Sequence, residues 1–171
     1  MKKSVFLLIA GCLMALGAQA QKFALIDMEY ILQHIPAYGQ AVSQLDADSK
    51  KYQSEVEALG QEAKRLYENY QKEADKLTAA QRTERENAIV AKEKEAAELR
   101  QQYFGPQGTM SQRQQQLMQP INNSIYEAVK TISLQQGYSL VLDRASDTAI
   151  FFASPAIDIS DEVLAKLGYS N

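Results

Sequence analysis

Cysteine, histidine, tryptophan, glycine and proline are all scarce in this chain of 171 residues. Cys12 is the only cysteine and His34 the only histidine, tryptophan is absent, and there are 8 glycines and 4 prolines. One cysteine excludes a disulfide framework, and neither a metal-binding cluster nor a glycine-rich phosphate loop is present. Any catalytic triad would need His34, which lies beside Pro36 in a segment typical of a structural histidine. We therefore expect no enzymatic activity, no cofactor and no metal.

Residues 1–20 have the pattern of an export signal. Lys2 and Lys3 precede the apolar run VFLLIAGCLMALG, and AQA (residues 18–20) is a small-x-small cleavage site. The apolar run is too short for a membrane span. We predict cleavage after Ala20 and an exported mature chain, residues 21–171, that forms one domain. The alternative is a lipoprotein, because IAGC (residues 9–12) matches the pattern before a lipidated cysteine, although no polar tether follows Cys12.

A heptad pattern runs from residue 38 to residue 77. Twelve positions lie alternately four and three residues apart, and ten of them are apolar or aromatic; the exceptions are Ser49 and Glu73. The positions are Tyr38, Val42, Leu45, Ser49, Tyr52, Val56, Leu59, Ala63, Leu66, Tyr70, Glu73 and Leu77. This spacing predicts a helix buried along a narrow seam. Forty helical residues span about 60 Å, too long for a compact domain of this size, so we expect the helix to project.

A second helix is predicted to return along the first. TAAQRTEREN is the expected reversal, with Thr78 as the N-cap. Arg85 and Lys92 occupy two seam positions, so we expect a loosely packed, flexible far end. The apolar seam positions of the return helix are Ile89, Ala96, Leu99 and Tyr103.

FGPQGT (residues 104–109) should break the return helix, because Pro106 removes a backbone donor. An apolar helical stripe then resumes and runs to about Gln136, with a possible kink at Pro120. The predicted helical arm thus covers residues 37–136.

Three short apolar segments are predicted to be strands: KFALIDM (22–28), YSLVLD (138–143) and TAIFFA (148–153). We expect a three-stranded sheet made of the N-terminal strand and a C-terminal β-hairpin, within a small body formed by residues 21–36 and 137–171. A short terminal helix should follow, with Ser160 as its N-cap and Gly168 just beyond its last turn. The body residues expected to meet other copies of the chain are Phe23, Leu25, Ile26, Leu140, Val141, Leu142, Ile150, Phe151 and Phe152. The fold class is α+β, mostly α.

Two acids close predicted strands, Asp27 and Asp143. We interpret them as strand-end turn residues rather than as an acid/base pair, with Arg144 as the expected partner of Asp143.

The order and spacing of these segments resemble the Skp/OmpH family of periplasmic chaperones. The resemblance rests on KFALIDMEYIL, on the heptad-bearing helical pair, on AVKTISLQQGYSLVLD and on DISDEVLAKL. It implies a homotrimer in which strands of three subunits form a barrel-like body and paired helices surround a cavity. It also implies that the protein holds unfolded outer-membrane β-barrel proteins in the periplasm without ATP.

Seven arm residues are candidates for client contact, although the same side chains could pack the two helices together. They are Leu66, Tyr67, Tyr70, Leu77, Ile89, Leu99 and Tyr103. The best-known family members are basic, whereas residues 38–103 here carry 11 basic and 13 acidic side chains. We therefore expect no basic patch, no nucleic acid binding and at most weak contact with membrane or lipopolysaccharide. The Gln-rich SQRQQQLMQP is a candidate for hydrogen bonding to clients.

The alternative function is a structural coiled-coil scaffold or spacer of the cell envelope. A scaffold should have tightly sealed helix seams, whereas a holder should have frayed ones around a cavity. Arg85 and Lys92 in the seam, together with the Gly-Pro break, favour the holder.

Overall fold

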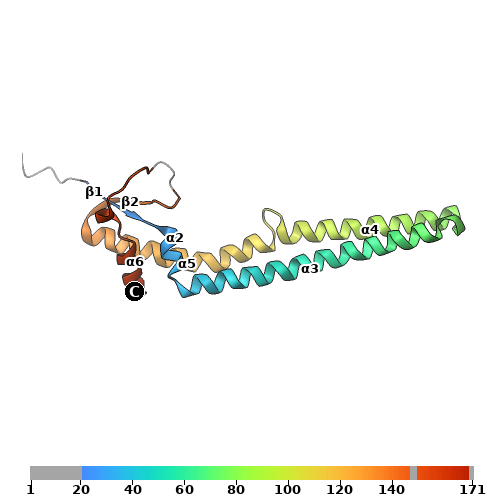
Figure 1. Cartoon of the computed structure of the whole chain (residues 1–171), viewed down its shortest axis with the longest axis horizontal. Helices are drawn as coiled ribbons and strands as arrows, with labels where there is room; N and C mark the ends of the chain where they lie inside the picture. The colour runs from blue at the N-terminus through green and yellow to red at the C-terminus, as the bar shows by residue number, and fades with distance from the viewer. Residues whose placement is uncertain (1–20, 147–149, 170–171) are drawn as a thin grey trace, which may run out of the picture. The chain divides into compact units, whose positions relative to one another are not determined.

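The computed structural model describes residues 21–146 and 150–169 (Figure 1). The predicted signal peptide, its cleavage site and Cys12 lie outside these residues. The elements in chain order are β1 (Lys22–Ile26), α2 (Met28–Gln33), α3 (Pro36–Glu73), η2 (Ala74–Lys76), α4 (Ala79–Phe104), α5 (Thr109–Gln136), β2 (Tyr138–Asp143), η3 (Pro155–Ile157) and α6 (Ser160–Leu167). No helix among the described residues is long and apolar enough to cross a membrane.

The chain divides into two compact units. The body unit combines the chain up to His34 with the part from Ser124 onward, and the arm unit is Ile35–Asn123. Helix α5 contributes to both units. The mostly helical α+β class is confirmed.

A parallel pair of strands forms the sheet of the body unit. Strand β1 pairs with β2 from Lys22↔Tyr138 to Ile26↔Asp143, with one irregularity after Lys22. Parallel strands need a long crossover, and here the crossover contains both long helices. The N-terminal strand and YSLVLD therefore lie in one sheet, as predicted.

The predicted second strand of the C-terminal hairpin is wrong over its described part. Residues 150–154 form no strand, and Phe151 and Phe152 are 99% and 87% exposed. A strand added here would leave apolar side chains in water, because no described element of the chain covers them. Within the described residues the sheet consequently has two strands instead of three.

The body core is built from apolar residues of every element type. Ala24 and Ile26 of β1, Ile31 of α2 and Val163 and Leu164 of α6 are all buried. On α5 the buried residues follow a helical spacing: Ile125, Ala128 and Ile132.

Capping residues and glycines mark the ends of the body helices. Asp27 caps α2, with its carboxylate accepting a hydrogen bond from the Tyr30 N–H at 2.9 Å. Gly137 and Gly168 have φ angles of 75° and 86° after α5 and α6, a conformation that favours glycine. The predicted N-cap of α6 is wrong: Ser160 is the first residue of the helix and Ile159 is its N-cap, because the Ser160 hydroxyl bonds to Asp27 and Asp158 instead.

The arm unit pairs α3 with α4 in antiparallel fashion (Figure 1). Thr78 caps α4 through a full capping box with Gln81, as predicted. The expected break is also confirmed: α4 ends at Phe104, and α5 begins at Thr109. Pro120 lies within α5 without ending the helix.

Candidate functional site

An exposed apolar surface lies on the body unit. Paired residues of a parallel sheet share a face, so Phe23 lies beside Leu140, and Leu25 beside Leu142. Phe23, Leu140 and Leu142 are 49%, 46% and 38% exposed. Together with the exposed Phe151 and Phe152, these three residues are called the apolar body surface below.

The other body residues named from the sequence are less accessible. Leu25 and Ile26 are buried within the single chain, and Val141 and Ile150 are partly exposed. Leu25 and Ile26 therefore belong to the core of one subunit, and the remaining residues are available for contact.

The two edges of the sheet differ. The outer edge of β1 is occupied, because the Ile159 N–H donates to the Leu25 carbonyl at 2.9 Å and Asp158 bridges to Leu25. No strand of the described residues lies along the outer edge of β2. An unpaired strand edge beside apolar side chains is a template for pairing with another chain.

A polar cluster ties the strand ends to the C-terminal segment. Arg144 lies 3.0 Å from Asp27 and 3.4 Å from Asp158, so the prediction that it pairs with Asp143 is wrong. The Ser160 hydroxyl accepts from the Asp27 N–H at 2.8 Å and donates to Asp158 at 2.6 Å. These roles of Asp158 and Ser160 were not predicted from the sequence. The partners are set by tertiary geometry, which local spacing does not reveal.

Asp143 is held as a carboxylate at the end of β2. Burial alone raises the pKa of Asp143, but hydrogen bonds from Ser146, Met28 and Ala145 outweigh it and lower the pKa below 3.8. The Met28 N–H donates to Asp143 at 3.0 Å and the Ser146 hydroxyl at 2.6 Å. These bonds fasten the start of α2 to β2, which supports the interpretation as a strand-end residue.

His34 also has a structural environment. Its Nδ1 lies 2.8 Å from the Tyr30 carbonyl oxygen, and its ring centroid lies 4.3 Å from that of Tyr30. No group of acids, cysteines and histidines among the described residues could hold a metal ion.

The heptad seam of the arm largely follows the prediction. Ala63 and Ile89 are buried, and most other predicted seam positions are partly buried. Near the start of α3 the seam lies one residue earlier than predicted: Ala41 is buried, whereas the predicted seam residue Val42 is 45% exposed.

Polar contacts link α3 to the returning helices. Arg85 lies 3.5 Å from Glu73, and Lys92 lies 3.5 Å from Glu62. Arg85 and Lys92 thus occupy the seam as predicted. Each forms an ion pair with an acid of α3, so these positions link the two helices instead of loosening their packing. The flexibility of the far end stays a prediction.

Two tyrosines complete the polar links. The Tyr70 hydroxyl donates to Glu86, and the Tyr103 hydroxyl donates to Glu55. Each hydrogen bond raises the pKa of its tyrosine. Tyr103 also stacks on Tyr52, with ring centroids 4.2 Å apart.

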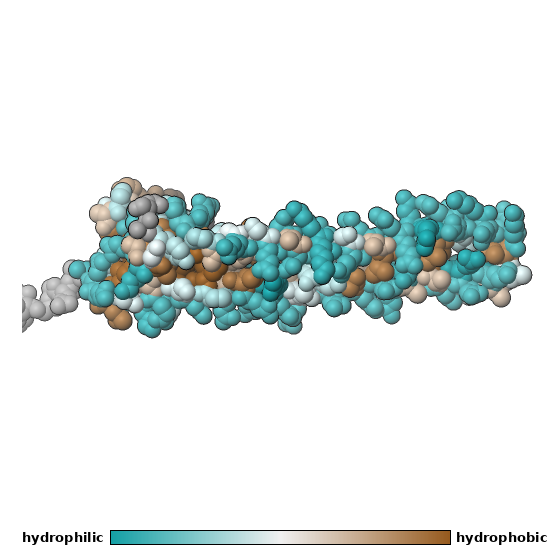
Figure 2. Space-filling view, turned by 90° about the horizontal axis from the view of Figure 1, so that it is seen from below, coloured by the Kyte–Doolittle hydropathy of each residue, from teal (hydrophilic) through white to brown (hydrophobic). Residues whose placement is uncertain are grey.

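Few of the seven candidate client residues are freely accessible. Tyr67 is 48% exposed, Ile89 is buried, and the other five are partly buried. For most of them, the contacts favour helix packing over client binding. Figure 2 shows hydrophobic residues of the helices as separate patches among hydrophilic ones.

Other apolar residues of the arm are more exposed and were missed. Val90 is 60% exposed and Phe104 is 39% exposed. Phe104 and Val56 line a groove of about 220 Å³ together with Gln53, Glu57 and Arg100. The signal in the sequence was the position of both residues just beside seam positions, Val90 next to Ile89 and Phe104 next to Tyr103.

The chain matches known proteins along nearly its whole length. The family model "Outer membrane protein (OmpH-like)" matches residues 22–167. The proteins named Chaperone protein Skp from Yersinia enterocolitica and Photorhabdus laumondii are 27% and 25% identical to this chain. The first match covers 98% of this chain and 99% of the relative, and the second covers 90% of each.

A solved structure has a similar fold. A crystal structure described as an OmpH-like outer membrane chaperone from Caulobacter crescentus CB15 aligns with a TM-score of 0.68 and 15% identity. The alignment covers 88% of this chain and 86% of that one. The named relatives are chaperones rather than enzymes, which confirms that prediction. Because the family model covers both units, the chain belongs to the OmpH-like family.

Proposed function

We propose that this protein is an ATP-independent periplasmic holdase that binds unfolded outer-membrane β-barrel proteins and prevents their aggregation. The observation that carries the proposal is the family match over residues 22–167, which includes both the strands and the long helices. Relatives across that length are named as chaperones. Unfolded barrel proteins expose apolar side chains and unpaired strand edges, which are the aggregation hazards that such a holder counters.

The proposed assembly is a homotrimer formed through the body. Phe151 and Phe152 are almost fully exposed, and the outer edge of β2 has no strand partner among the described residues. Association would bury this apolar body surface and supply the missing cover. The arms of three copies would then surround one client.

The arms are proposed to hold the client by many weak contacts. Tyr67, Val90 and Phe104 offer exposed apolar surface at separate places on the arm unit. Several such contacts from three arms give a high effective concentration around the client, and each one remains easily reversible. This mode of holding needs no nucleotide.

The proposed location is the periplasm, after cleavage behind Ala20. Mass spectrometry of the mature N-terminus should find Gln21; a diacylated Cys12 would instead show a lipoprotein. The acidic balance of residues 38–103 argues against nucleic acid and allows at most weak contact with membrane or lipopolysaccharide.

The direct test is aggregation of an outer-membrane barrel protein diluted from urea. We expect the mature protein to suppress light scattering at about one trimer per client, with no ATP present. Scattering equal to that of the client alone would overturn the holdase proposal.

The scaffold alternative has one observation in its favour. The ion pairs Arg85–Glu73 and Lys92–Glu62 close the seam that sequence analysis expected to be frayed. A scaffold would bind one fixed envelope partner and leave the scattering of diverse unfolded barrels unchanged, whereas a holder would protect several of them.

A further inference from the structure

The segment from the end of α4 into α5 is almost free of charge. Residues 101–126 contain one charged side chain, Arg113, although 23% of the whole chain is charged. Arg113 is itself paired, since its Nε lies 3.2 Å from Asp48 of α3. The surface of this segment is thus electrically neutral.

Glutamine takes the place of charge here. Eight glutamines occur within residues 101–119, and all eight are exposed. They are Gln101, Gln102, Gln107, Gln112, Gln114, Gln115, Gln116 and Gln119, and together we call them the glutamine surface. Only Gln112 has a side-chain hydrogen bond within the described structure, to the Gln107 carbonyl at 3.1 Å. The other seven side-chain amides are exposed and have no hydrogen-bond partner among the described residues.

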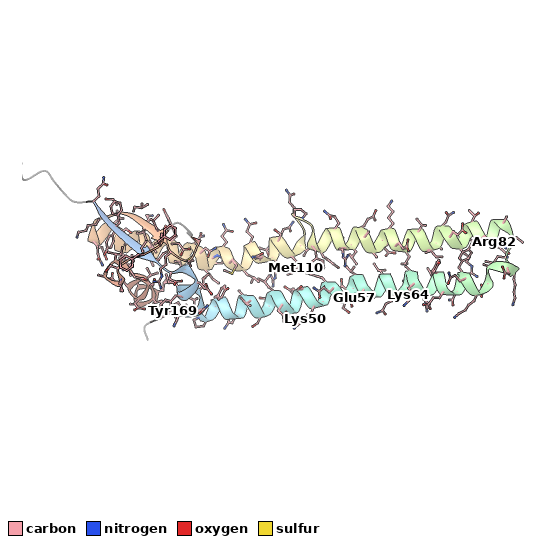
Figure 3. All side chains as sticks on the ribbon, turned by 45° about the horizontal axis from the view of Figure 1, so that its top comes forward. Lys50, Glu57, Lys64, Arg82, Met110 and Tyr169 are labelled. Atoms are coloured by element: carbon pink, nitrogen blue, oxygen red, sulfur yellow. The ribbon has the colours of Figure 1, made fainter. Side chains whose placement is uncertain are left out.

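Other helix faces of the arm unit are built differently. Exposed acids and bases pair along the helices, as in Lys50–Asp46 and Lys94–Glu98 (Lys50, Glu57 and Lys64 are labelled along α3 in Figure 3). Two of the five glutamines of α3 have local partners, since Gln53 donates to Ser49 and Gln71 donates to Tyr67. The glutamine surface differs from these faces because its eight glutamines lie within 19 residues that contain a single charged side chain.

The loop between α4 and α5 holds part of this surface in a fixed form. The Gly105 N–H donates to the Gln101 carbonyl at 2.9 Å, and the Gly108 N–H donates to the Gly105 carbonyl at 2.8 Å. A Cβ on Gly105 would overlap the Gln101 carbonyl oxygen, and one on Gly108 would lie 2.7 Å from the Tyr103 carbonyl oxygen. Four glutamines line a cavity of about 330 Å³ beside this loop: Gln101, Gln102, Gln107 and Gln112. The loop backbone thus fixes where these four side chains start, and binding has to order only the side chains themselves.

We propose that the glutamine surface binds the main chain of unfolded polypeptides through amide–amide hydrogen bonds. This inference rests on the proposed holding function and names a recognition chemistry for it. A primary amide carries both a donor and an acceptor, as does each peptide group of an unfolded chain. Recognition of the main chain is independent of client sequence, and a neutral surface is indifferent to client charge.

The strength of such contacts suits a holder that must release its client. Each hydrogen bond replaces one to water, so its net contribution is small and it exchanges readily. Several of them together, with the arms of other copies, retain a client by multivalency.

The test compares two triple variants. The first is Gln115→Ala, Gln116→Ala and Gln119→Ala in the glutamine surface. The matched control is Gln40→Ala, Gln44→Ala and Gln61→Ala on α3, where the glutamines are also exposed and have no side-chain partner among the described residues. Alanine preserves helix propensity at all six positions. The affinity for a labelled, urea-unfolded barrel protein should fall about tenfold in the first variant and less than twofold in the control.

A second measurement isolates the main chain as the recognised group. The probe is a soluble peptide of alternating apolar and polar residues, compared with the same peptide carrying N-methyl groups on alternate amides. The parent protein should bind the N-methylated peptide several-fold more weakly, and the first triple variant should lose this discrimination.

The outcomes separate this inference from the proposed function. If the parent binds no unfolded barrel protein, the holding function itself fails. If the parent binds it and the first variant binds equally well, or the control variant loses as much, recognition by the glutamine surface is overturned. Equal binding of both peptides by the parent would also overturn it.

Discussion

The two units of this chain differ in how far they cover their own apolar side chains. The arm unit completes its own seam: where apolar residues stop, Arg85 meets Glu73, Lys92 meets Glu62, and Tyr103 stacks on Tyr52. The body unit closes its polar groups around Arg144 but leaves Phe151 and Phe152 almost fully exposed. The apolar side chains that the body unit leaves exposed are the basis of the association proposed above, whereas the arm unit pairs the side chains of its own seam.

The largest expected effect comes from removing the exposed phenylalanines of the body. Phe151→Ser with Phe152→Ser should convert the assembled protein to monomer at micromolar concentration, because two large apolar side chains lose their place in the interface. Sedimentation velocity measures the result. The control is Tyr67→Ser, a comparably exposed aromatic residue of the arm, which should leave the mass unchanged; an intact oligomer in the double variant would contradict the assignment of the interface.

The next largest effect is expected from truncating a buried residue in the seam of the arm. Ile89→Ala should lower the free energy of unfolding by about 2 kcal/mol, because it opens a cavity between α3 and α4. The neighbouring Val90→Ala is the matched control, since Val90 is 60% exposed and its truncation should cost well under 1 kcal/mol. Thermal and urea unfolding distinguish the two variants, and equal losses would show that the seam is placed wrongly.

Replacing the seam cations tests whether arm pliability serves holding. Arg85→Leu with Lys92→Leu should stabilise the arm by about 1 kcal/mol per leucine, because each side chain is only partly covered and the exposed ion pairs it replaces contribute little. The stiffer arm should protect large unfolded barrel proteins less well and small ones nearly as well as the parent.

The control for this charge change is Lys64→Leu with Lys94→Leu, whose side chains are 76% and 74% exposed. If the seam variant melts higher yet protects large clients fully, pliability plays no part in holding.

A smaller effect concerns the acid end of the pH range. The pKa of Asp143 is lower in the folded chain than its ordinary value of 3.8, so the ionised carboxylate stabilises the folded body at pH values above 3.8. This contribution is lost as the pH falls through the folded-state pKa. Asp143→Asn should therefore lower the melting temperature slightly at neutral pH and flatten its decline below pH 4. A melting curve as steep below pH 4 as that of the parent would contradict this role.

Regular patterns made most of the arm predictable. The seam of α3, the cap at Thr78 and the break before Thr109 all depend on neighbours within a few residues in sequence. The error at Val42 has a physical cause: a straight helix has 3.6 residues per turn and drifts from a 3.5-residue repeat, so burial passes to Ala41.

The body was less predictable because its contacts join distant segments. The apolar TAIFFA has the composition of a strand, but strand formation needs covering surface that one chain does not provide. Arg144 reaches Asp27 and Asp158 across the fold instead of its sequence neighbour. The charged seam positions Arg85 and Lys92 were interpreted as weak points in the packing. Their acidic partners on α3 could not be identified from the sequence, because the register of the two helices was not known.

We expect the body alone to form the trimer, and a chain without most of its arm can show this. Residues 50–111 are replaced by a short turn, which keeps the Asp48–Arg113 pair near the join. Analytical ultracentrifugation of this shortened chain should give the mass of a trimer. A folded monomer would contradict the claim.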